Sequence, residues 1–163
     1  MSTQTPDATS QGLLAQRHIA TIATENSDGT LHLTAVWYLY ENGKLFIATS
    51  SKSRKARNLQ ARPKASLMID VRRPGQERGV TAAGTAELIS GDRSQQINRR
   101  VHSRYMSPAA IADQAIGPVF EIFDDVTICL TPSSWTAWNM AVLDAQAFGG
   151  RLCGTPGYLL PLD

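Results

Sequence analysis

Alternating apolar and polar residues between positions 30 and 40 give the strongest structural signal in the chain. The apolar positions are Leu31, Leu33, Ala35, Trp37 and Leu39. A period of two over eleven residues predicts one long strand with an apolar face and a mixed face. Asn42-Gly43 follows it, and this dipeptide favours a type I′ hairpin turn. The segment therefore predicts a β-hairpin whose returning strand covers residues 44–49.

Turn residues and apolar runs predict the remaining elements. Further strands are expected over residues 18–24, 65–71, 80–89 and 126–130. One helix is expected to begin at Ser50, Ser51 or Ser53 and to end before Pro63. Two more are expected, one capped by Asp92 or Ser94 and one that begins at Ser107-Pro108. Because strands dominate the first ninety residues, the pattern predicts a mainly β fold, an antiparallel barrel with peripheral helices.

The length and composition fit one globular domain. The chain has 163 residues, of which 42% are hydrophobic and 18% are charged. Residues 1–14 begin with a polar stretch that resembles no signal peptide, and we expect a flexible N-terminal tail there. Residues 15–150 are expected to form the barrel domain, followed by a C-terminal tail over residues 151–163.

Several classes of protein are excluded by what the sequence lacks. Cys129 and Cys153 form no Cys-x-x-Cys pair, so both are expected to pack as small apolar side chains. With only two cysteines and no disulfide framework, a cytoplasmic protein is expected. No apolar run approaches the roughly 20 residues that a membrane-spanning helix needs. His18, His32 and His102 lack the spacing of metal ligands, which predicts that there is no metal site.

The distribution of charge is more informative than its sum. The net charge is only +2, from 16 basic and 14 acidic residues. Six of the basic residues lie between Lys52 and Lys64 with no acid among them. At the start of a helix, beside Thr49, Ser51 and Ser53, such cations suit a phosphate group. A basic surface helix and a nucleic-acid-binding helix are the other interpretations. Nucleic acid is disfavoured because the cluster is short and the rest of the chain carries ten cations against 14 acids.

Four segments in series resemble one protein family. They are Val36-Trp37-Tyr38, residues 44–49, residues 53–59 and Gly84-Thr85-Ala86-Glu87-Leu88. In order and spacing they are similar to the flavin and deazaflavin split β-barrel oxidoreductases, the superfamily that includes pyridoxamine 5′-phosphate oxidase. This resemblance implies an antiparallel split β-barrel of the FMN-binding type. It also implies a homodimer with the cofactor at the subunit interface. The implied cofactor is FMN or, as the alternative, F420.

The resemblance also implies which residues hold the cofactor. Arg54 and Lys55 match the pair that binds its phosphate, with Arg57 as a further candidate. Thr49 and Ser53 match hydroxyl positions near the same group. The strand residues Thr34, Ala35, Val36 and Trp37 match the segment whose backbone lines the ring system. No residue is assigned as catalytic, because in such enzymes the cofactor carries the electrons.

Two departures separate this chain from true pyridoxamine phosphate oxidases. Gly79 stands where those enzymes carry a cofactor-contacting glutamine, and their C-terminal substrate motif is absent from residues 151–163. The tail instead carries Trp135 and Trp138. These side chains could cover the cofactor ring, contact a partner subunit or simply anchor the C-terminal segment by hydrophobic packing. We expect hydride transfer to or from a small organic substrate. A flavin- or haem-binding protein without turnover is the alternative.

Overall fold

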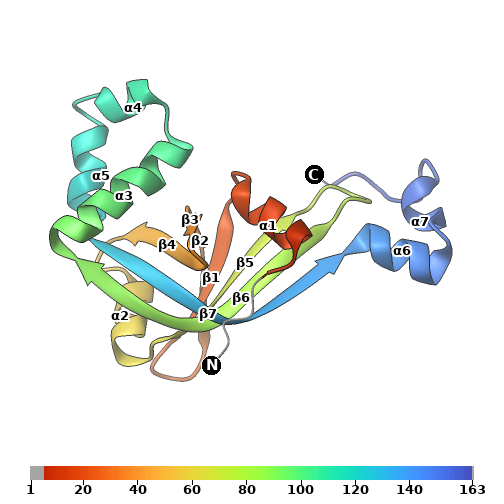
Figure 1. Cartoon of the computed structure of the whole chain (residues 1–163), viewed down its shortest axis with the longest axis horizontal. Helices are drawn as coiled ribbons and strands as arrows, with labels where there is room; N and C mark the ends of the chain where they lie inside the picture. The colour runs from red at the N-terminus through yellow and green to blue at the C-terminus, as the bar shows by residue number, and fades with distance from the viewer. Residues whose placement is uncertain (1–5, 163) are drawn as a thin grey trace.

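The computed structural model describes residues 6–162, in which seven strands and seven helices succeed one another (Figure 1). The strands are β1 (Ala20–Glu25), β2 (Leu31–Val36), β3 (Leu39–Glu41), β4 (Lys44–Thr49), β5 (Lys64–Val71), β6 (Arg78–Ser90) and β7 (Val126–Asn139). The helices are α1 (Ala8–Ala15), α2 (Arg54–Ala61), α3 (Gly91–Tyr105), α4 (Pro108–Ala112), α5 (Gly117–Phe123), α6 (Met140–Phe148) and α7 (Arg151–Gly154).

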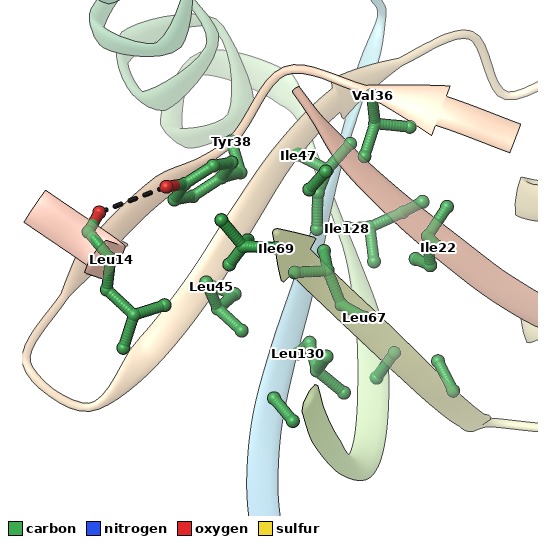
Figure 2. Close-up of a cluster of buried hydrophobic side chains, with 14 of the residues drawn as sticks. Leu14, Ile22, Val36, Tyr38, Leu45, Ile47, Leu67, Ile69, Ile128 and Leu130 are labelled. Carbon is green, nitrogen blue, oxygen red and sulfur yellow. Dashed lines mark hydrogen bonds between the residues drawn. The ribbon is translucent and has the colours of Figure 1, made fainter. Parts of the chain in front are cut away.

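All strands belong to one antiparallel sheet in the order β2-β1-β5-β6-β7-β4-β3. Consecutive strands β2 and β3 lie at opposite edges of this sheet, so the chain between them brings the two edges together. Branched aliphatic side chains from both halves fill the interior (Figure 2). The expected antiparallel barrel with peripheral helices is therefore confirmed.

The hairpin prediction is confirmed, but its first strand is interrupted. Asn42 and Gly43 both adopt positive φ, at 51° and 75°, and join β3 to β4 as a type I′ turn requires. The long strand expected over residues 30–40 instead breaks after Val36. Tyr38 lies at the break with a fully buried side chain, and its hydroxyl donates to the carbonyl oxygens of Leu14 and Gln16 (Figure 2 draws the first of these bonds). Tertiary packing of Tyr38 thus overrides the local alternation.

The predicted helix ends are partly correct. Ser53 caps α2 by accepting a hydrogen bond from the Ala56 N–H, and Ser107 caps α4, which begins at Pro108. Neither Asp92 nor Ser94 caps α3, because this helix begins earlier, after Ser90. Ser94 is instead buried within the helix, where its hydroxyl bonds that of Thr127.

Segments near both ends of the chain form more regular structure than expected. Residues 8–14, assigned to a flexible tail, belong to α1, whose Leu13 and Leu14 pack into the core. Residues 1–5 of that tail lie outside the described residues. The last strand, expected over residues 126–130, continues to Asn139 because β6 pairs with it along its whole length. Helices α6 and α7 then project from its end (Figure 1). Between residues 6 and 162, no helix is long and apolar enough to cross a membrane.

Candidate functional site

A hollow of about 350 Å³ lies where the strands β2 and β4 end, beside the start of α2. Its walls come from β2, β4 and α2, together with the end of α5. The lining residues are Ile19, Ala35, Val36, Trp37, Ala48, Thr49, Lys55, Phe120 and Asp124. An apolar wall with a few polar groups is typical of a small-molecule site. We refer to this hollow as the barrel pocket.

Stacked aromatic rings form one wall of the barrel pocket. The Trp37 indole stacks with Tyr105 and with Phe120, with ring centroids 5.1 and 5.8 Å away and interplanar angles of 2° and 17°. The Tyr105 hydroxyl donates to the carbonyl oxygen of His18 at 2.8 Å, which fixes α3 against the start of β1. Trp37 is therefore held in place by ring stacking with residues of α3 and α5, and the pocket wall is preorganised.

Helix α2 is fixed on the sheet by its buried face. The Asn58 amide donates to Thr24 Oγ1 at 3.1 Å and to Asn26 Oδ1 at 3.0 Å, and Leu59 packs into the core. These contacts set the rotation of the helix, so that Lys55 faces the barrel pocket. Arg54 and Arg57 face a neighbouring hollow of about 490 Å³ that is also lined by Asn26 and Asp28 at the β1–β2 turn. We refer to this second hollow as the turn pocket.

The nine residues matched to the cofactor site therefore fall into three groups. Ala35, Val36, Trp37, Thr49 and Lys55 line the barrel pocket, and Arg54 and Arg57 line the turn pocket. Thr34 and Ser53 border neither hollow. Thr34 points toward the inner side of the sheet, in register with buried Ile22. Ser53 caps α2, and its hydroxyl oxygen accepts a hydrogen bond from Thr49 Oγ1 at 3.2 Å.

Carboxylates from other elements lie near the basic segment, although none interrupts it in sequence. Asp125 accepts hydrogen bonds from the backbone and side chain of Ser51, both at 2.6 Å. These bonds lower the pKa of Asp125, and the charge of Lys52 adds to the effect. The pKa of Asp28 is lowered mainly by hydrogen bonds from Thr30, with a smaller contribution from Arg54. The folded chain thus offsets part of the positive field that the sequence concentrates there.

Three cations nevertheless keep their charge available. Among residues 6–162, ion pairs within 4 Å involve none of Arg54, Lys55 or Arg57. Burial lowers the pKa of the Lys55 ammonium group, and the charge of Asp124 partly restores it. A half-buried cation without a close counter-ion favours binding of an anion.

Asp124 is held in the barrel pocket by α3. His102, which is buried, bonds an Asp124 carboxylate oxygen through Nε2 at 2.8 Å. The Asn98 amide donates to the Asp124 carbonyl oxygen at 2.7 Å. Phe120, one turn earlier, packs its ring 5.1 Å from the His102 imidazole. These contacts bind the end of α5 to α3 and position an acidic group opposite Lys55.

The contribution of α5 to the site was not predicted from the sequence. Phe120 and Asp124 lie about 65 residues beyond the basic segment, and helix α5 was not predicted at all. Their only signal is the pair Asp124-Asp125, which directly precedes the strand expected over residues 126–130. Because β7 pairs with β4, this acidic pair is brought next to Thr49 and the start of α2.

The residues present fit a ligand with a planar ring and a phosphate. The barrel pocket offers a flat aromatic wall. The strand β2 ends the sheet, so one side of its backbone has no strand partner within residues 6–162. The adjoining start of α2 offers hydroxyl groups and three cations that form no ion pair within residues 6–162. An extended backbone edge suits a heteroaromatic ring, and fixed cations suit its phosphate.

Gly79 is packed against an aromatic ring. It lies in register with Trp138 across β6 and β7, and a Cβ atom there would lie 2.7 Å from the Trp138 Nε1 atom. A glutamine at this position would therefore require the indole to move. This packing explains, in physical terms, why the position is a glycine in this chain.

Metal and thiol chemistry find no support in the part of the chain that the structure describes. No group of three His, Cys, Asp or Glu residues there suits a metal ion. Cys129 is buried in β7 as a small apolar residue, as expected, and Cys153 is a free thiol in α7. Both lie away from the residues that line the barrel pocket.

Comparison with known proteins agrees with this architecture. The sequence model of the family described as pyridoxamine 5′-phosphate oxidase matches residues 7–139. No curated protein sequence matches the chain.

Three solved structures are similar in fold. A conserved hypothetical protein from Mycobacterium tuberculosis is 22% identical, with a TM-score of 0.69, over 100% of this chain and 97% of that one. An F420 reductase is 21% identical, with a TM-score of 0.63, over 80% of this chain and 98% of its own. The heme storage protein HutZ from Vibrio cholerae is 16% identical, with a TM-score of 0.61, over 83% and 95%.

Proposed function

Because the chain belongs to the pyridoxamine 5′-phosphate oxidase family, as the match over residues 7–139 establishes, we propose that it binds a phosphorylated redox cofactor. FMN is the proposed cofactor and F420 the alternative. The proposed activity is transfer of a hydride between that cofactor and a small organic substrate. The bound ring would supply the redox chemistry, which none of the common side chains provides.

One observation carries the proposal: an aromatic pocket adjoins a helix start whose three cations form no ion pair within residues 6–162. Lys55 and Arg54 would hold the phosphate, with Arg57 beside them. Ala35, Val36 and Trp37 would line the ring. Asp124, held by His102, lies in the same pocket and places a carboxyl group near the bound ligand.

Haem storage, the other function among structural neighbours, is less well supported by the residues of the pocket. A haem iron is usually bound by His, Cys, Met or Tyr. None of the nine residues that line the barrel pocket is of these types. Binding of a flavin without turnover fits the same residues as an enzyme does, and separating the two requires a test of reduction.

The absorbance spectrum of the protein, purified under conditions that retain its ligand, tests this proposal. Flavin bands, or the single band of a deazaflavin, are the expected result, and reduction of that band by NAD(P)H or reduced F420 would establish turnover. A Soret band would replace the proposal with haem binding. A protein that remains colourless after incubation with excess FMN, F420 or haem would contradict all three.

The lowered pKa of Lys55 predicts a pH dependence of cofactor binding. Because burial favours the neutral amine, Lys55 loses its proton at a lower pH than an ordinary lysine, and the attraction for a phosphate is lost with it. The affinity for FMN should therefore fall as pH rises through the pKa of Lys55, below 10.5. In the Lys55→Arg variant, which stays charged, this fall should be absent. Titration of FMN fluorescence between pH 7 and pH 10 measures the effect, and identical profiles would contradict it.

We also propose that the active protein is a homodimer. On the outer side of β2, Leu31 and Leu33 are 64% and 60% exposed, and nearby Ile19 is 52% exposed. The outer residues of the adjoining strands are small or uncharged: Thr21, Ala23, Ser66, Met68, Thr81, Ala83, Ser134 and Thr136. A face of this kind, with Glu25, Lys64 and Asp70 only at its margins, is typical of a protein interface.

A further inference from the structure

The helices α3, α4 and α5 lie together at one end of the molecule (Figure 1). Between them is a hollow of about 280 Å³, whose apolar walls come from Met106, Ile111, Pro118 and Phe120. We refer to it as the helix pocket. Its volume lies close to the lower limit of about 300 Å³ for ordinary small-molecule sites, so it suits a ligand smaller than a typical drug molecule.

The helix pocket adjoins the barrel pocket. Phe120 borders both hollows, and its ring therefore forms part of the wall between them. His102 lines the helix pocket and Asp124 lines the barrel pocket. The hydrogen bond of 2.8 Å between His102 Nε2 and the Asp124 carboxylate crosses the same wall. A molecule in one hollow thus lies beside a molecule in the other.

His102 keeps one ring nitrogen for a ligand. The residue is only 5% exposed, and its Nε2 atom bonds Asp124. Among the contacts within residues 6–162, its Nδ1 atom has no hydrogen-bond partner, although this atom is not fully enclosed by protein. Nδ1 is therefore open to the helix pocket, which His102 lines. Because buried polar groups are nearly always hydrogen-bonded, an unpaired nitrogen at the wall of a hollow indicates a ligand.

We propose that the helix pocket binds the organic substrate, a small aldehyde or ketone or the corresponding alcohol, through His102 Nδ1. This inference rests on the proposed function and names the substrate class. Because an ionised carboxylate only accepts hydrogen bonds, Nε2 donates to Asp124. Nδ1 then accepts in the neutral ring and donates in the protonated ring. The other charged residues of the pocket, Arg99 and Glu121, pair with each other at 2.7 Å, which favours an uncharged substrate.

The same nitrogen supplies the proton that hydride transfer to a carbonyl group requires. As the hydride from the bound cofactor forms the new C–H bond, the π bond of the carbonyl group breaks and its oxygen takes the proton from His102 Nδ1. The substrate gains two electrons, the cofactor loses two, and the imidazolium ring becomes neutral until water returns a proton. Oxidation of the alcohol is the same step in reverse. Rotation of the Phe120 side chain would bring the carbonyl carbon to the ring in the barrel pocket.

Titration of the full chain with acetophenone and with 1-phenylethanol tests the inference. The two probes share an apolar body, but a ketone oxygen only accepts hydrogen bonds, whereas a hydroxyl group accepts or donates. Both should give a saturable shift of the Met106 methyl signal in NMR spectra. Acetophenone should bind at least about fivefold more tightly at about pH 5.5 than at about pH 8.5, because a histidine is protonated and donates at the lower value. The affinity of the alcohol should change by less than about twofold.

The alcohol also controls for the other charged groups near His102. These are Asp124 at Nε2, Arg99 and Glu121 in the helix pocket, and Lys55, which lines the barrel pocket with Asp124. A change in their charge with pH acts on both probes, whereas the charge of His102 distinguishes the ketone from the alcohol.

Two variants separate substrate binding from the positioning of Asp124. The amide of His102→Gln still donates to Asp124 but gains no charge, so acetophenone should bind at least about fivefold more weakly at the lower pH and without pH dependence. Ser103→Trp, at an exposed position of α3, fills the helix pocket without removing a buried group and should abolish binding of both probes. His32→Gln, at a histidine that lines neither hollow, should change nothing. Thermal unfolding establishes that each variant is folded.

The outcomes distinguish this inference from the proposed function. Equal affinity for acetophenone at the two pH values, or a pH dependence that persists in His102→Gln, would overturn the inference. Absence of a saturable shift at Met106 in a chain that binds FMN would overturn it too, and would leave the cofactor site intact. A chain that binds acetophenone as expected but neither FMN nor F420 would overturn the proposed function and leave the helix pocket as a binding site.

Discussion

Replacing Arg54 and Lys55 together with alanine should weaken FMN binding by at least about 100-fold while leaving a folded protein. A hydrogen bond to a charged group contributes about 1.5–3 kcal/mol, and two such groups are lost. Both side chains lie on the outer side of α2, whereas Ala56, Asn58 and Leu59 anchor the helix. The cooperativity of thermal unfolding should therefore be preserved. Isothermal titration with FMN measures the affinity.

The two single variants locate the phosphate. Lys55 faces the barrel pocket and Arg54 the turn pocket, so the phosphate contact need not be shared equally. A larger loss in Lys55→Ala would place the phosphate in the barrel pocket, and a larger loss in Arg54→Ala would place it in the turn pocket. Arg72→Ala, at a cation paired with Asp70 far along the chain, is the matched control. Full retention of FMN in the double variant would contradict the phosphate assignment.

The basic segment shows how far sequence reasoning extends. Its six cations, its serine cap and its position before Pro63 all predict a helix with a positive start, and the structure contains that helix. The sequence does not indicate that successive residues Arg54 and Lys55 face different hollows. This follows from the helical rotation, which is set by long-range bonds of Asn58 to Thr24 and Asn26.

The interrupted strand shows a different limit. Alternation correctly predicts extended structure from residue 31 onward, and it separates Leu31 and Leu33 from the mixed face. The mixed face, however, is the one that supplies the core, through Val36 and Tyr38. Periodicity identifies two faces of a strand but not which of them a partner subunit covers. In a chain proposed to dimerise, the apolar face can lie outside the monomer.

Residues distant in sequence were the least predictable part of the site. Phe120 and Asp124 reach the barrel pocket because β7 pairs with β4 and because His102 bonds the Asp124 carboxylate. Both the strand pairing and the hydrogen bond depend on the tertiary structure. The individual residue types carry no signal of them, since an aspartate before a strand is an ordinary loop residue.

Truncation of Leu14 to alanine should lower the free energy of unfolding by about 2–5 kcal/mol, the usual cost of a large-to-small change in a well-packed core. The polar composition around this residue predicts a frayed tail, in which the same substitution would have almost no effect. In the structure Leu14 is fully buried, and its carbonyl oxygen accepts the hydroxyl proton of Tyr38. Urea denaturation followed by tryptophan fluorescence measures the change.

The control for this prediction is an aliphatic side chain of similar size that contacts little. Ile122 is 76% exposed on α5, and Ile122→Ala should change the free energy of unfolding by less than about 0.5 kcal/mol. If Leu14→Ala were equally mild, α1 would not be part of the core. Because α1 supports Tyr38 at the break between β2 and β3, the Leu14 variant should also weaken FMN binding. Loss of stability together with loss of affinity would show that the N-terminal helix holds the pocket wall in place.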